Sequence, residues 1–174
     1  DEADSDPDGP NTSQVVVLAS GEYNKSIDGG VYMPASLGDR VWHDANANGQ
    51  QDAGESGIAG VKVHLIGGGA DGQLVTTADN TVLSTVTDAD GKYRFDGLVP
   101  ATEYQVRFET PDGMLATKQD TGNDAGDSDA GANGLSQVLT LASGENNPTV
   151  DAGFYRSASL GDRVWIDANA NGQQ

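Results

Sequence analysis

One stretch of this chain has the residue types and the spacing of a calcium loop. Residues 44–55 match the twelve-position pattern D-x-[DN]-x-[DN]-G-x5-E at every specified position. In such a loop the oxygens at positions 1, 3 and 5 converge on one cation, glycine permits the sharp turn, and the final glutamate closes the shell. The pattern therefore predicts a Ca²⁺ site with six ligands: Asp44, Asn46, Asn48, Gln50, Asp52 and Glu55. Gln50, at position 7 of the loop, would bind through its backbone carbonyl.

The surroundings of this loop differ from those of a helix–loop–helix calcium site. Val41-Trp42 precedes the loop and Gly57-Ile-Ala-Gly60 follows it, so we expect an EF-hand-like loop between strands. Hard oxygen ligands in a chain without cysteine favour Ca²⁺ over zinc or copper. The competing interpretation is an ordinary Asn-Gly turn of a β protein, which leaves the other matched positions unexplained.

A second group of carboxylates is less specific. Four aspartates fall within ten residues, with no lysine or arginine between them: Asp120, Asp124, Asp127 and Asp129. A solvated acidic loop is one interpretation, but uncompensated carboxylates repel one another unless a cation or water relieves them. Asp88 and Asp90, at a predicted hairpin, could contribute two more ligands. The sequence predicts two or three Ca²⁺ ions per complete repeat and does not assign each aspartate to an ion.

The composition limits the partners of the chain. Its 174 residues include 27 acidic and 9 basic side chains, which give a formal net charge of −18. Such a charge argues against binding to nucleic acid or to anionic membranes, which relies on lysine and arginine. No apolar run approaches the roughly 18 residues of a membrane-spanning helix. The absence of cysteine excludes disulfides and thiolate chemistry.

The chain repeats itself at an offset of 123 residues. Residues 1–51 align without gaps on residues 124–174, and 32 of the 51 pairs are identical. A period of this length suits a self-contained domain better than a solenoid repeat. We therefore expect residues 1–34 to be the C-terminal part of a preceding repeat, 35–157 a complete domain, and 158–174 the start of the next repeat.

Short alternating runs within the complete repeat predict β-strands. Residues 61–65 and 104–108 place apolar side chains at every second position, the period of a half-buried strand. Turn signals separate these runs from further candidate strands: 37–42, 81–87, 93–95, 136–141 and 150–155. About seven short strands in about 120 residues predict an all-β, two-sheet sandwich. The near absence of a linker between repeats predicts a stiff rod.

At these residues the chain resembles the B repeats of serine-aspartate-repeat (Sdr-type) surface adhesins. The resemblance covers residues 38–42 leading into the calcium loop, and four later segments: 57–65, 87–95, 127–129 and 150–154. It implies a prealbumin-like, Cna-B-type Greek-key β-sandwich that binds Ca²⁺ and acts as a stalk in a secreted or cell-surface protein. It also implies the ligands of the 44–55 loop and, more weakly, Asp88, Asp90, Asp127 and Asp129.

Related pilin-type B domains cross-link themselves through a Lys–Asn or Lys–Asp isopeptide bond that an acid assists. This sequence departs from that pattern, because the first predicted strand has no lysine and Phe108 stands where the assisting acid would be. We therefore expect no isopeptide bond, with Ca²⁺ as the cross-link in its place.

These observations predict a calcium-binding stalk or spacer module of a large tandem-repeat adhesin or extracellular filament protein. An enzyme is not expected, because His43 lies beside an acid but is replaced by Ile166 in the next repeat, and His64 lies on the polar phase of a strand. The main alternative is a carbohydrate- or protein-binding module in which Trp42 forms a stacking platform. Packing in the core or between domains is the other role for that side chain.

The expected partners are neighbouring repeats of the same chain, in an extracellular setting. Extracellular versions of the loop bind Ca²⁺ at roughly 10⁻⁴–10⁻³ M, so the site would be filled there and not in a cytoplasm. Neither partial repeat can close a sandwich alone, so neighbouring chains could complete them through open strand edges. We expect no nucleic acid and no membrane insertion for this segment, and a signal and anchor outside it.

Overall fold

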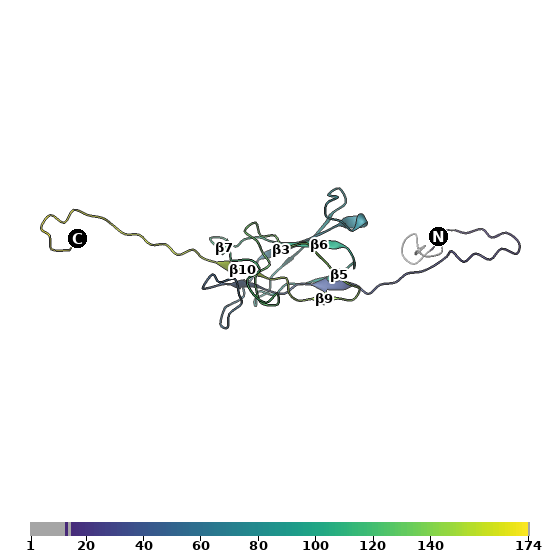
Figure 1. Ribbon diagram of the computed structural model, residues 1–174, viewed down its shortest axis with the longest axis horizontal. Helices are drawn as coiled ribbons and strands as arrows, with labels where there is room; N and C mark the ends of the chain where they lie inside the picture. Colours follow the sequence, from purple (N-terminus) through teal and green to yellow (C-terminus); the bar gives the residue numbers. More distant parts are fainter. Residues whose placement is uncertain (1–12, 14, 174) are drawn as a thin grey trace.

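A computed structural model of the chain describes residue 13 and residues 15–173. Figure 1 shows a central body from whose opposite ends the N-terminal and C-terminal segments extend. The first part of the predicted 1–34 segment, including the Asp4-Ser-Asp6 counterpart of Asp127-Ser-Asp129, lies outside the described residues. Within the described part of the chain, no helix is long and apolar enough to cross a membrane.

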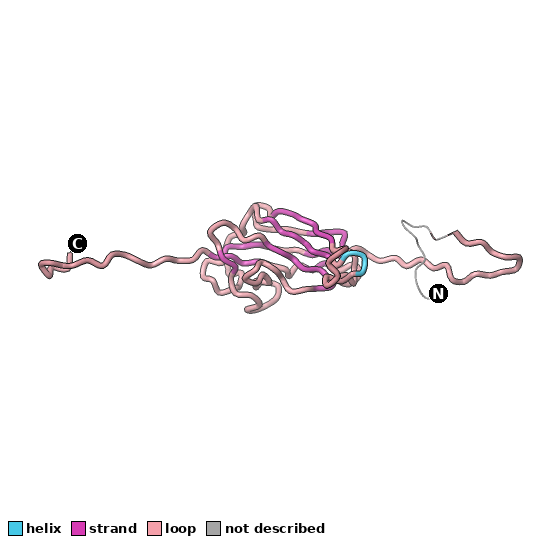
Figure 2. The backbone as a smooth tube through the Cα atoms, turned by 90° about the horizontal axis from the view of Figure 1, so that it is seen from above, coloured by secondary structure: helices cyan, strands magenta, loops and turns pink. Residues whose placement is uncertain are grey.

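The regular elements of the body are short β-strands joined by turns and loops. Within the described residues the elements are β1 (Ala35–Leu37), β2 (Val41–His43), β3 (Lys62–Gly67), the 3₁₀ helix η1 (Gly69–Asp71), β4 (Thr81–Val86), β5 (Phe95–Leu98), β6 (Glu103–Phe108), β7 (Leu115–Ala116), β8 (Leu139–Thr140), β9 (Asn146–Asn147) and β10 (Ala152–Tyr155). The strands run along the length of the body, and η1 lies at the end where the N-terminal segment leaves (Figure 2).

The strands form one four-stranded sheet and two three-stranded sheets. The four-stranded sheet has the order β4-β3-β6-β8 and is antiparallel throughout, whereas the smaller sheets are β5-β1-β9 and β2-β10-β7. β1 pairs in parallel with β9, and β2 pairs in parallel with β10. The beginning and the end of the domain therefore lie side by side, which places the calcium-loop sequence after β2 next to the last strand.

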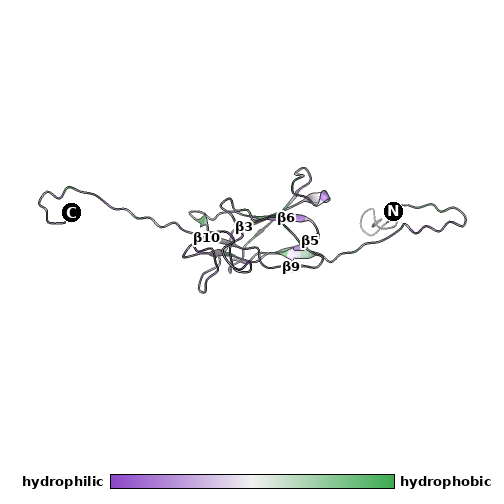
Figure 3. Ribbon diagram, in the orientation of Figure 1, coloured by the Kyte–Doolittle hydropathy of each residue, from purple (hydrophilic) through white to green (hydrophobic). Residues whose placement is uncertain are grey.

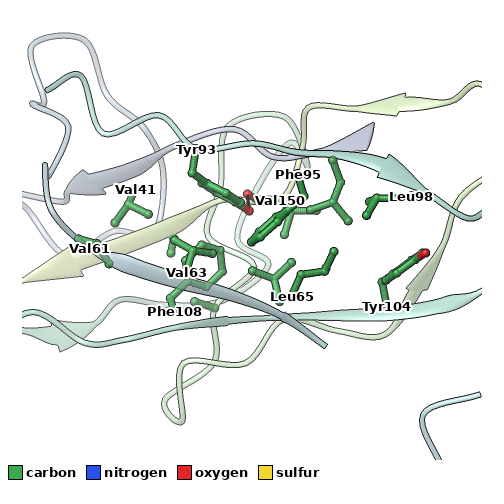
Figure 4. Close-up of a cluster of buried hydrophobic side chains, with 14 of the residues drawn as sticks. Val41, Val61, Val63, Leu65, Tyr93, Phe95, Leu98, Tyr104, Phe108 and Val150 are labelled. Carbon is green, nitrogen blue, oxygen red and sulfur yellow. Dashed lines mark hydrogen bonds between the residues drawn. The ribbon is translucent and has the colours of Figure 1, made fainter. Parts of the chain in front are cut away.

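The hydrophobic core lies between the four-stranded sheet and the two smaller sheets (Figure 4). On β3 the alternation is strict, since Val63 and Leu65 are buried while Lys62 and His64 face outward. The ring of Tyr93 packs edge-on against Phe108, and its hydroxyl donates a hydrogen bond to the carbonyl of Val150 at 2.6 Å. Green in Figure 3 is confined to short stretches such as β10, as expected for strands that are apolar on one face only. The predicted all-β sandwich is confirmed.

The strand boundaries differ from the prediction at the first strand. The expected run 37–42 is divided into β1 and β2, because the chain passes close to the strand opposite at Gly38. A Cβ at Gly38 would lie 2.3 Å from the carbonyl oxygen of Tyr93, so only glycine fits there. Asp39 and Arg40 then bond outside a regular ladder, the amide of Tyr93 to the carbonyl of Asp39 and the amide of Arg40 to Asp151.

Other strands are shorter than predicted or were not predicted. The run 136–141 contains only β8, since the Ser136 side chain instead accepts the amide hydrogen of Val106. The run 93–95 becomes a strand only from Phe95 onward. β7 and β9 have two residues each, which is too short for any periodicity to reveal.

The segment before β1 is attached to the domain that it enters. The carbonyl of Met33 accepts a hydrogen bond from the amide of Gly144 at 2.9 Å, and the amide of Met33 donates to the Ser143 hydroxyl at 2.9 Å. These bonds fix the chain two residues before the first strand.

Candidate metal centre

The loop between β2 and β3 closes on its first aspartate. Asp44 is fully buried, and its carboxylate accepts hydrogen bonds from the amides of Gly49 at 2.8 Å and Asn48 at 3.3 Å. The turn needs left-handed backbone at Gly49 (φ 88°) and also at Ala47 (φ 55°), a conformation that a residue with a Cβ seldom adopts. The sequence therefore wraps the backbone around Asp44 at some conformational cost.

The later positions of the loop converge on the same space. The side-chain amides of Asn46 and Asn48 both donate to one oxygen of Asp52, each at 2.8 Å. The two Glu55 oxygens accept the amide hydrogens of Ala45 at 2.8 Å and Asp52 at 3.0 Å. All six predicted ligand positions are thus joined by hydrogen bonds to side chains of the loop, since the amide of Gln50 also donates to Asn48 Oδ1 at 2.7 Å.

This arrangement can be tested for its fit to a cation. Two N–H donors, from Asn46 and Asn48, point at one oxygen of Asp52, where a positive partner would be favourable. Each asparagine oxygen already accepts a backbone amide hydrogen, Asn46 from Asn48 at 2.9 Å and Asn48 from Gln50 at 2.7 Å. Rotating either side-chain amide by half a turn would present its oxygen to a cation in place of its nitrogen, with the loss of that hydrogen bond, and would supply a hard oxygen ligand suited to Ca²⁺. No three His, Asp or Glu side chains of the described residues form a metal-holding group. The amides and the carbonyl of Gln50 would therefore have to complete the shell, and with them the residues fit the ion.

The electrostatics at Asp44 favour its charged form. Burial raises the pKa of the Asp44 carboxyl, but the hydrogen bonds from Thr117, Gly49 and Asn48 outweigh it, so the pKa lies below its ordinary value. The Thr117 hydroxyl makes the shortest of these bonds, at 2.6 Å. Asp44 is therefore held as a carboxylate in a buried position.

The acidic segment 118–129 packs against this loop. The amide of Gln51 donates to the carbonyl of Gly126 at 2.8 Å, and the amide of Ser128 donates to the carbonyl of Gly49 at 3.1 Å. The Thr121 hydroxyl also donates to the carbonyl of Asn48 at 3.2 Å. The two acidic regions predicted from the sequence are therefore adjacent parts of one end of the domain.

A pair of buried carboxylates lies behind this segment. Asp129 accepts the amide hydrogen of Asp151 at 2.6 Å, and one oxygen of Asp151 accepts that of Arg40 at 2.9 Å. The second oxygen of Asp151 is buried and has no hydrogen-bond partner among the described residues. Buried carboxylates are normally fully bonded, so this oxygen marks a position where compensation is missing.

The pKa values of the pair reflect that deficit. Burial raises the pKa of Asp129 to about 7, with further increases from the charges of Asp124, Asp127 and Asp120. Burial raises the pKa of Asp151 to about 8, helped by the charges of Asp39, Asp129 and Asp127. In each case one backbone hydrogen bond opposes the increase. Near neutral pH these two carboxyls therefore retain their protons far more readily than ordinary aspartates.

The SdrD B-like domain family matches residues 35–154. This range spans the sandwich from the start of β1 to the last but one residue of β10. The chain belongs to this family. It is 40% identical over 167 residues to serine-aspartate repeat-containing protein F of Staphylococcus epidermidis, covering 94% of this chain and 9% of that protein. It is also 40% identical over 163 residues to serine-aspartate repeat-containing protein D of Staphylococcus aureus strain Newman, covering 91% of this chain and 11% of that protein. The chain thus spans about a tenth of the length of these relatives.

Two pilins are among the solved structures similar to this SdrD B-like domain. The major pilin SpaD of Corynebacterium diphtheriae is 14% identical, with a TM-score of 0.42 over 75% of this chain and 33% of the pilin. The shaft pilin SpaA of Lactobacillus rhamnosus GG is 14% identical, with a TM-score of 0.40 over 74% of this chain and 52% of the pilin.

The remaining predicted ligands of this SdrD B-like domain fall into two places. Asp124 and Asp129 line one hollow of about 170 Å³, beside Val150. Asp88 lines a different groove, and its carboxylate accepts the amide hydrogens of Asp90 and Lys92 at 2.9 and 2.8 Å. Asp124 therefore lies beside Asp129 of the buried pair, Asp127 is buried nearby with its carboxylate on the amide of Gly122, and the 88–90 turn lies in a separate groove.

Sequence reasoning overlooked Asp151 and Thr117. An aspartate inside the apolar run 150–155 was a usable signal, and Asp28 occupies the matching position one period earlier. Thr117 had no such signal, because its contact with Asp44 depends on the pairing of β7 with β10.

The structure rules out one form of the binding-module alternative. Trp42 is fully buried, and a Cβ at Gly153 would lie 2.7 Å from its ring, so the indole packs closely against bare backbone. It offers no platform on which a sugar could stack, and its role is packing inside the domain.

The two histidines do not assemble a catalytic site. His64 contacts the Ser84 hydroxyl at 2.8 Å and Glu109 at 2.9 Å, a nucleophile–base–acid order. Hydrolysis by such a group also needs oxyanion donors in a cleft, whereas these side chains lie on the outer face of the four-stranded sheet. His43 is half-buried, and its amide donates to the carbonyl of Ser56.

Proposed function

We propose that this SdrD B-like domain is a calcium-binding stalk or spacer in a large extracellular repeat protein. Its named relatives are serine-aspartate repeat-containing proteins of staphylococci, and the chain repeats itself after 123 residues. Residues 1–34 and 158–174 then belong to the neighbouring repeats, and the protein acts at a cell surface. Its role is mechanical: the domain separates the parts of the protein on either side of it and stiffens the repeat array.

The observation that carries this proposal is the position of the acidic loops. The amide of Asp44 donates to the carbonyl of Phe154 at 2.9 Å, so the candidate calcium loop begins against the last strand. The 118–129 segment packs on the same loop from the other side. A bound Ca²⁺ would supply positive charge and oxygen coordination at the end of the domain from which the chain leaves for the next repeat.

Each residue of the loop has a role that does not depend on the ion. Thr117, Gly49 and Asn48 hold Asp44 as a carboxylate, and Glu55 bridges both ends of the loop through two backbone amides. Asn46, Asn48 and Asp52 would then supply side-chain oxygens, and Gln50 its carbonyl. The backbone of this loop is therefore already folded around Asp44, whereas the side-chain amides of Asn46 and Asn48 would rotate to bind the cation.

A second ion fits the acidic hollow. The unpaired oxygen of Asp151 and the raised pKa values of Asp129 and Asp151 both indicate missing positive charge. Asp124 supplies an exposed carboxylate beside Asp129, and the buried Asp127 adds negative charge nearby while it accepts the amide hydrogen of Gly122 at 2.6 Å. A third ion at Asp88 and Asp90 would be a separate surface site.

The attachment of Met33 supports the spacer role. If each junction is held as this one is, by bonds to Ser143 and Gly144, consecutive repeats have little freedom to bend. Stiffness would then arise at both ends of every repeat, from the bonded linker at one end and the acidic loops at the other.

Calcium binding is tested by unfolding the chain with Ca²⁺ and with EGTA. We expect Ca²⁺ to raise the melting temperature and slow proteolysis, since a ligand of the folded state stabilises it by linkage. Asp44→Asn should remove most of this shift, because it weakens the buried carboxylate of the loop.

The matched control is Asp167→Asn, the same change in the incomplete copy of the loop. It should leave the calcium-induced shift intact. An equal melting temperature with Ca²⁺ and EGTA, or an equal loss in both variants, would reject the calcium assignment. Isothermal titration would then count the ions per chain.

A further inference from the structure

Among the residues that the structure describes, the four-stranded sheet ends in a strand with no neighbour on its outer side. β4 pairs only with β3, and all six of its residues are exposed or nearly so, with Val82, Leu83 and Val86 each at least half exposed. Edge strands are normally protected by charge, proline or a bulge. β4 has none of these, since no charged residue or proline occurs between Asp79 and Asp88.

The register of the β3–β4 ladder defines which backbone groups are free. The amide of Thr87 donates to the carbonyl of Val61, and antiparallel partners alternate between bonded and non-bonded pairs. Thr81, Leu83 and Thr85 therefore direct their amides and carbonyls toward β3. Val82, Ser84 and Val86 direct theirs outward.

We propose that β4 pairs antiparallel with β4 of a second copy of this chain, about a two-fold axis that passes beside Ser84. The strand fits itself in this register. Val82 of one copy faces Val86 of the other, Ser84 faces Ser84, and the outward amides and carbonyls of all three residues are bonded. The two Val82–Val86 pairs add apolar cross-strand contacts on the outer face.

Charge favours this strand over other surfaces as the place where two copies meet. Two chains of net charge −18 repel each other, so contact is least unfavourable where each is neutral. The two-fold register places Asp88 opposite Asn80 and Asp79 opposite Ala89, so no carboxylate faces another directly. The uncharged stretch of eight residues from 80 to 87 is thus also the stretch that would be covered.

One such contact is small. Six paired residues per chain bury less than the roughly 1,200 Å² of a stable interface, so a single domain should associate weakly. An array with one β4 edge in each 123-residue repeat would present many contacts in a row, which multiplies the strength of association. Because the strands run along the body (Figure 2), antiparallel pairing brings together rods that point in opposite directions. This last step rests on the proposed role as a repeat in a rod, but the pairing itself does not require calcium.

Disulfide trapping tests the register, since the chain has no cysteine of its own. Ser84→Cys places two thiols across the axis at the roughly 5.5 Å Cα separation of a bonded antiparallel pair, which a disulfide can span. Val82→Cys and Val86→Cys each place their thiol opposite a valine, so neither should form homodimers. An equimolar mixture of these two variants should form the mixed dimer.

The expected result is that Ser84→Cys oxidises to dimer at least about tenfold faster than Val82→Cys alone, because pairing raises the effective thiol concentration. Equal rates for all three variants would overturn the proposal, as would rapid homodimer formation by Val82→Cys, which indicates parallel pairing or another antiparallel register. Sedimentation equilibrium of the cysteine-free chain at rising concentration gives an independent readout. Association there should be lost in Ser84→Lys and kept in Thr76→Lys, which adds the same charge in the loop before β4.

Discussion

Two copies of one loop sequence occur in this chain in different surroundings. Asp44 begins the copy inside the sandwich and Asp167 the copy outside it, and both carry Asp-Ala-Asn-Ala-Asn-Gly-Gln-Gln. In each, the first aspartate accepts the glycine amide, at 2.8 Å for Asp44 and 2.7 Å for Asp167. The second alanine has positive φ in both copies, 55° at Ala47 and 53° at Ala170. The turn is therefore encoded within these eight residues.

The surroundings separate the two copies. Asp44 is fully buried and receives the Thr117 hydroxyl, whereas the pKa of Asp167 is lowered chiefly by the amide of Gly172. Trp42, two residues before the first copy, is fully buried, while its counterpart Trp165 is 39% exposed. The shape of the turn is therefore determined by the loop residues themselves, whereas the burial of Asp44 and its hydrogen bond to Thr117 depend on the rest of the domain. Substitutions at matched positions of the two copies can measure how much the rest of the domain contributes to stability.

The largest expected difference concerns the two tryptophans. Trp42→Ala should destabilise the domain by about 3–5 kcal/mol, because it leaves a cavity against Gly153. Trp165→Ala should change stability by less than about 0.5 kcal/mol, as expected for a residue outside the packed body. Chemical denaturation of both variants measures this. Similar losses would show that the second copy is packed after all.

The buried partner of the first copy gives the next effect. Thr117→Val keeps the shape of the side chain but removes the hydroxyl that donates to Asp44. We expect a loss of about 1–3 kcal/mol, the cost of leaving a buried acceptor unsatisfied. Thr121→Val, which removes a longer bond to a backbone carbonyl, serves as the control. A smaller loss at Thr117 than at Thr121 would contradict the assigned role.

The buried carboxyls of Asp129 and Asp151 predict an unusual pH dependence of the stability of the domain. Asp129 and Asp151 have pKa values of about 7 and about 8 in the folded state, above their ordinary value of 3.8. The folded state therefore binds more protons than the unfolded state between roughly pH 4 and 8, and stability should rise as pH falls through that window. Each unit of difference corresponds to about 1.4 kcal/mol.

Thermal unfolding in EGTA across this range measures the effect. Asp151→Asn should flatten the profile and raise the melting temperature at pH 8, since the amide oxygen still accepts the amide hydrogen of Arg40 without a buried charge. Added Ca²⁺ should flatten the profile of the unmodified chain. A profile that rises with pH in EGTA would show that the pair is compensated in another way.

The smallest expected effect concerns the left-handed alanine that both copies of the turn contain. Ala47→Gly relieves the left-handed conformation of the alanine, at a cost of roughly 1–2 kcal/mol, but adds freedom to the unfolded chain worth roughly 0.5–1 kcal/mol. We expect a net gain of about 0.5 kcal/mol in the free energy of unfolding. Ala170→Gly should have no measurable effect on the melting of the domain. Loss of stability in Ala47→Gly would indicate that the methyl group makes a necessary contact.

The sequence was sufficient for the fold class and for the loop, because both are written in short patterns. Alternation at 61–65 and 104–108 predicted β3 and β6, and the spacing of 44–55 predicted a turn that both copies adopt. What it could not reveal is contact between distant segments. Asp151 faces Asp129 and Thr117 reaches Asp44 only because β10 pairs with both β2 and β7.

The parallel pairing of β2 with β10 has a consequence under load. A pull on a repeat array enters the domain at β1 and leaves it at β10, from opposite ends of the body (Figure 1). Because β2 and β10 run in the same direction side by side, such a pull slides one along the other and strains all the hydrogen bonds between them together. Tension across the domain therefore acts as shear on this pair of strands and does not open their bonds one at a time.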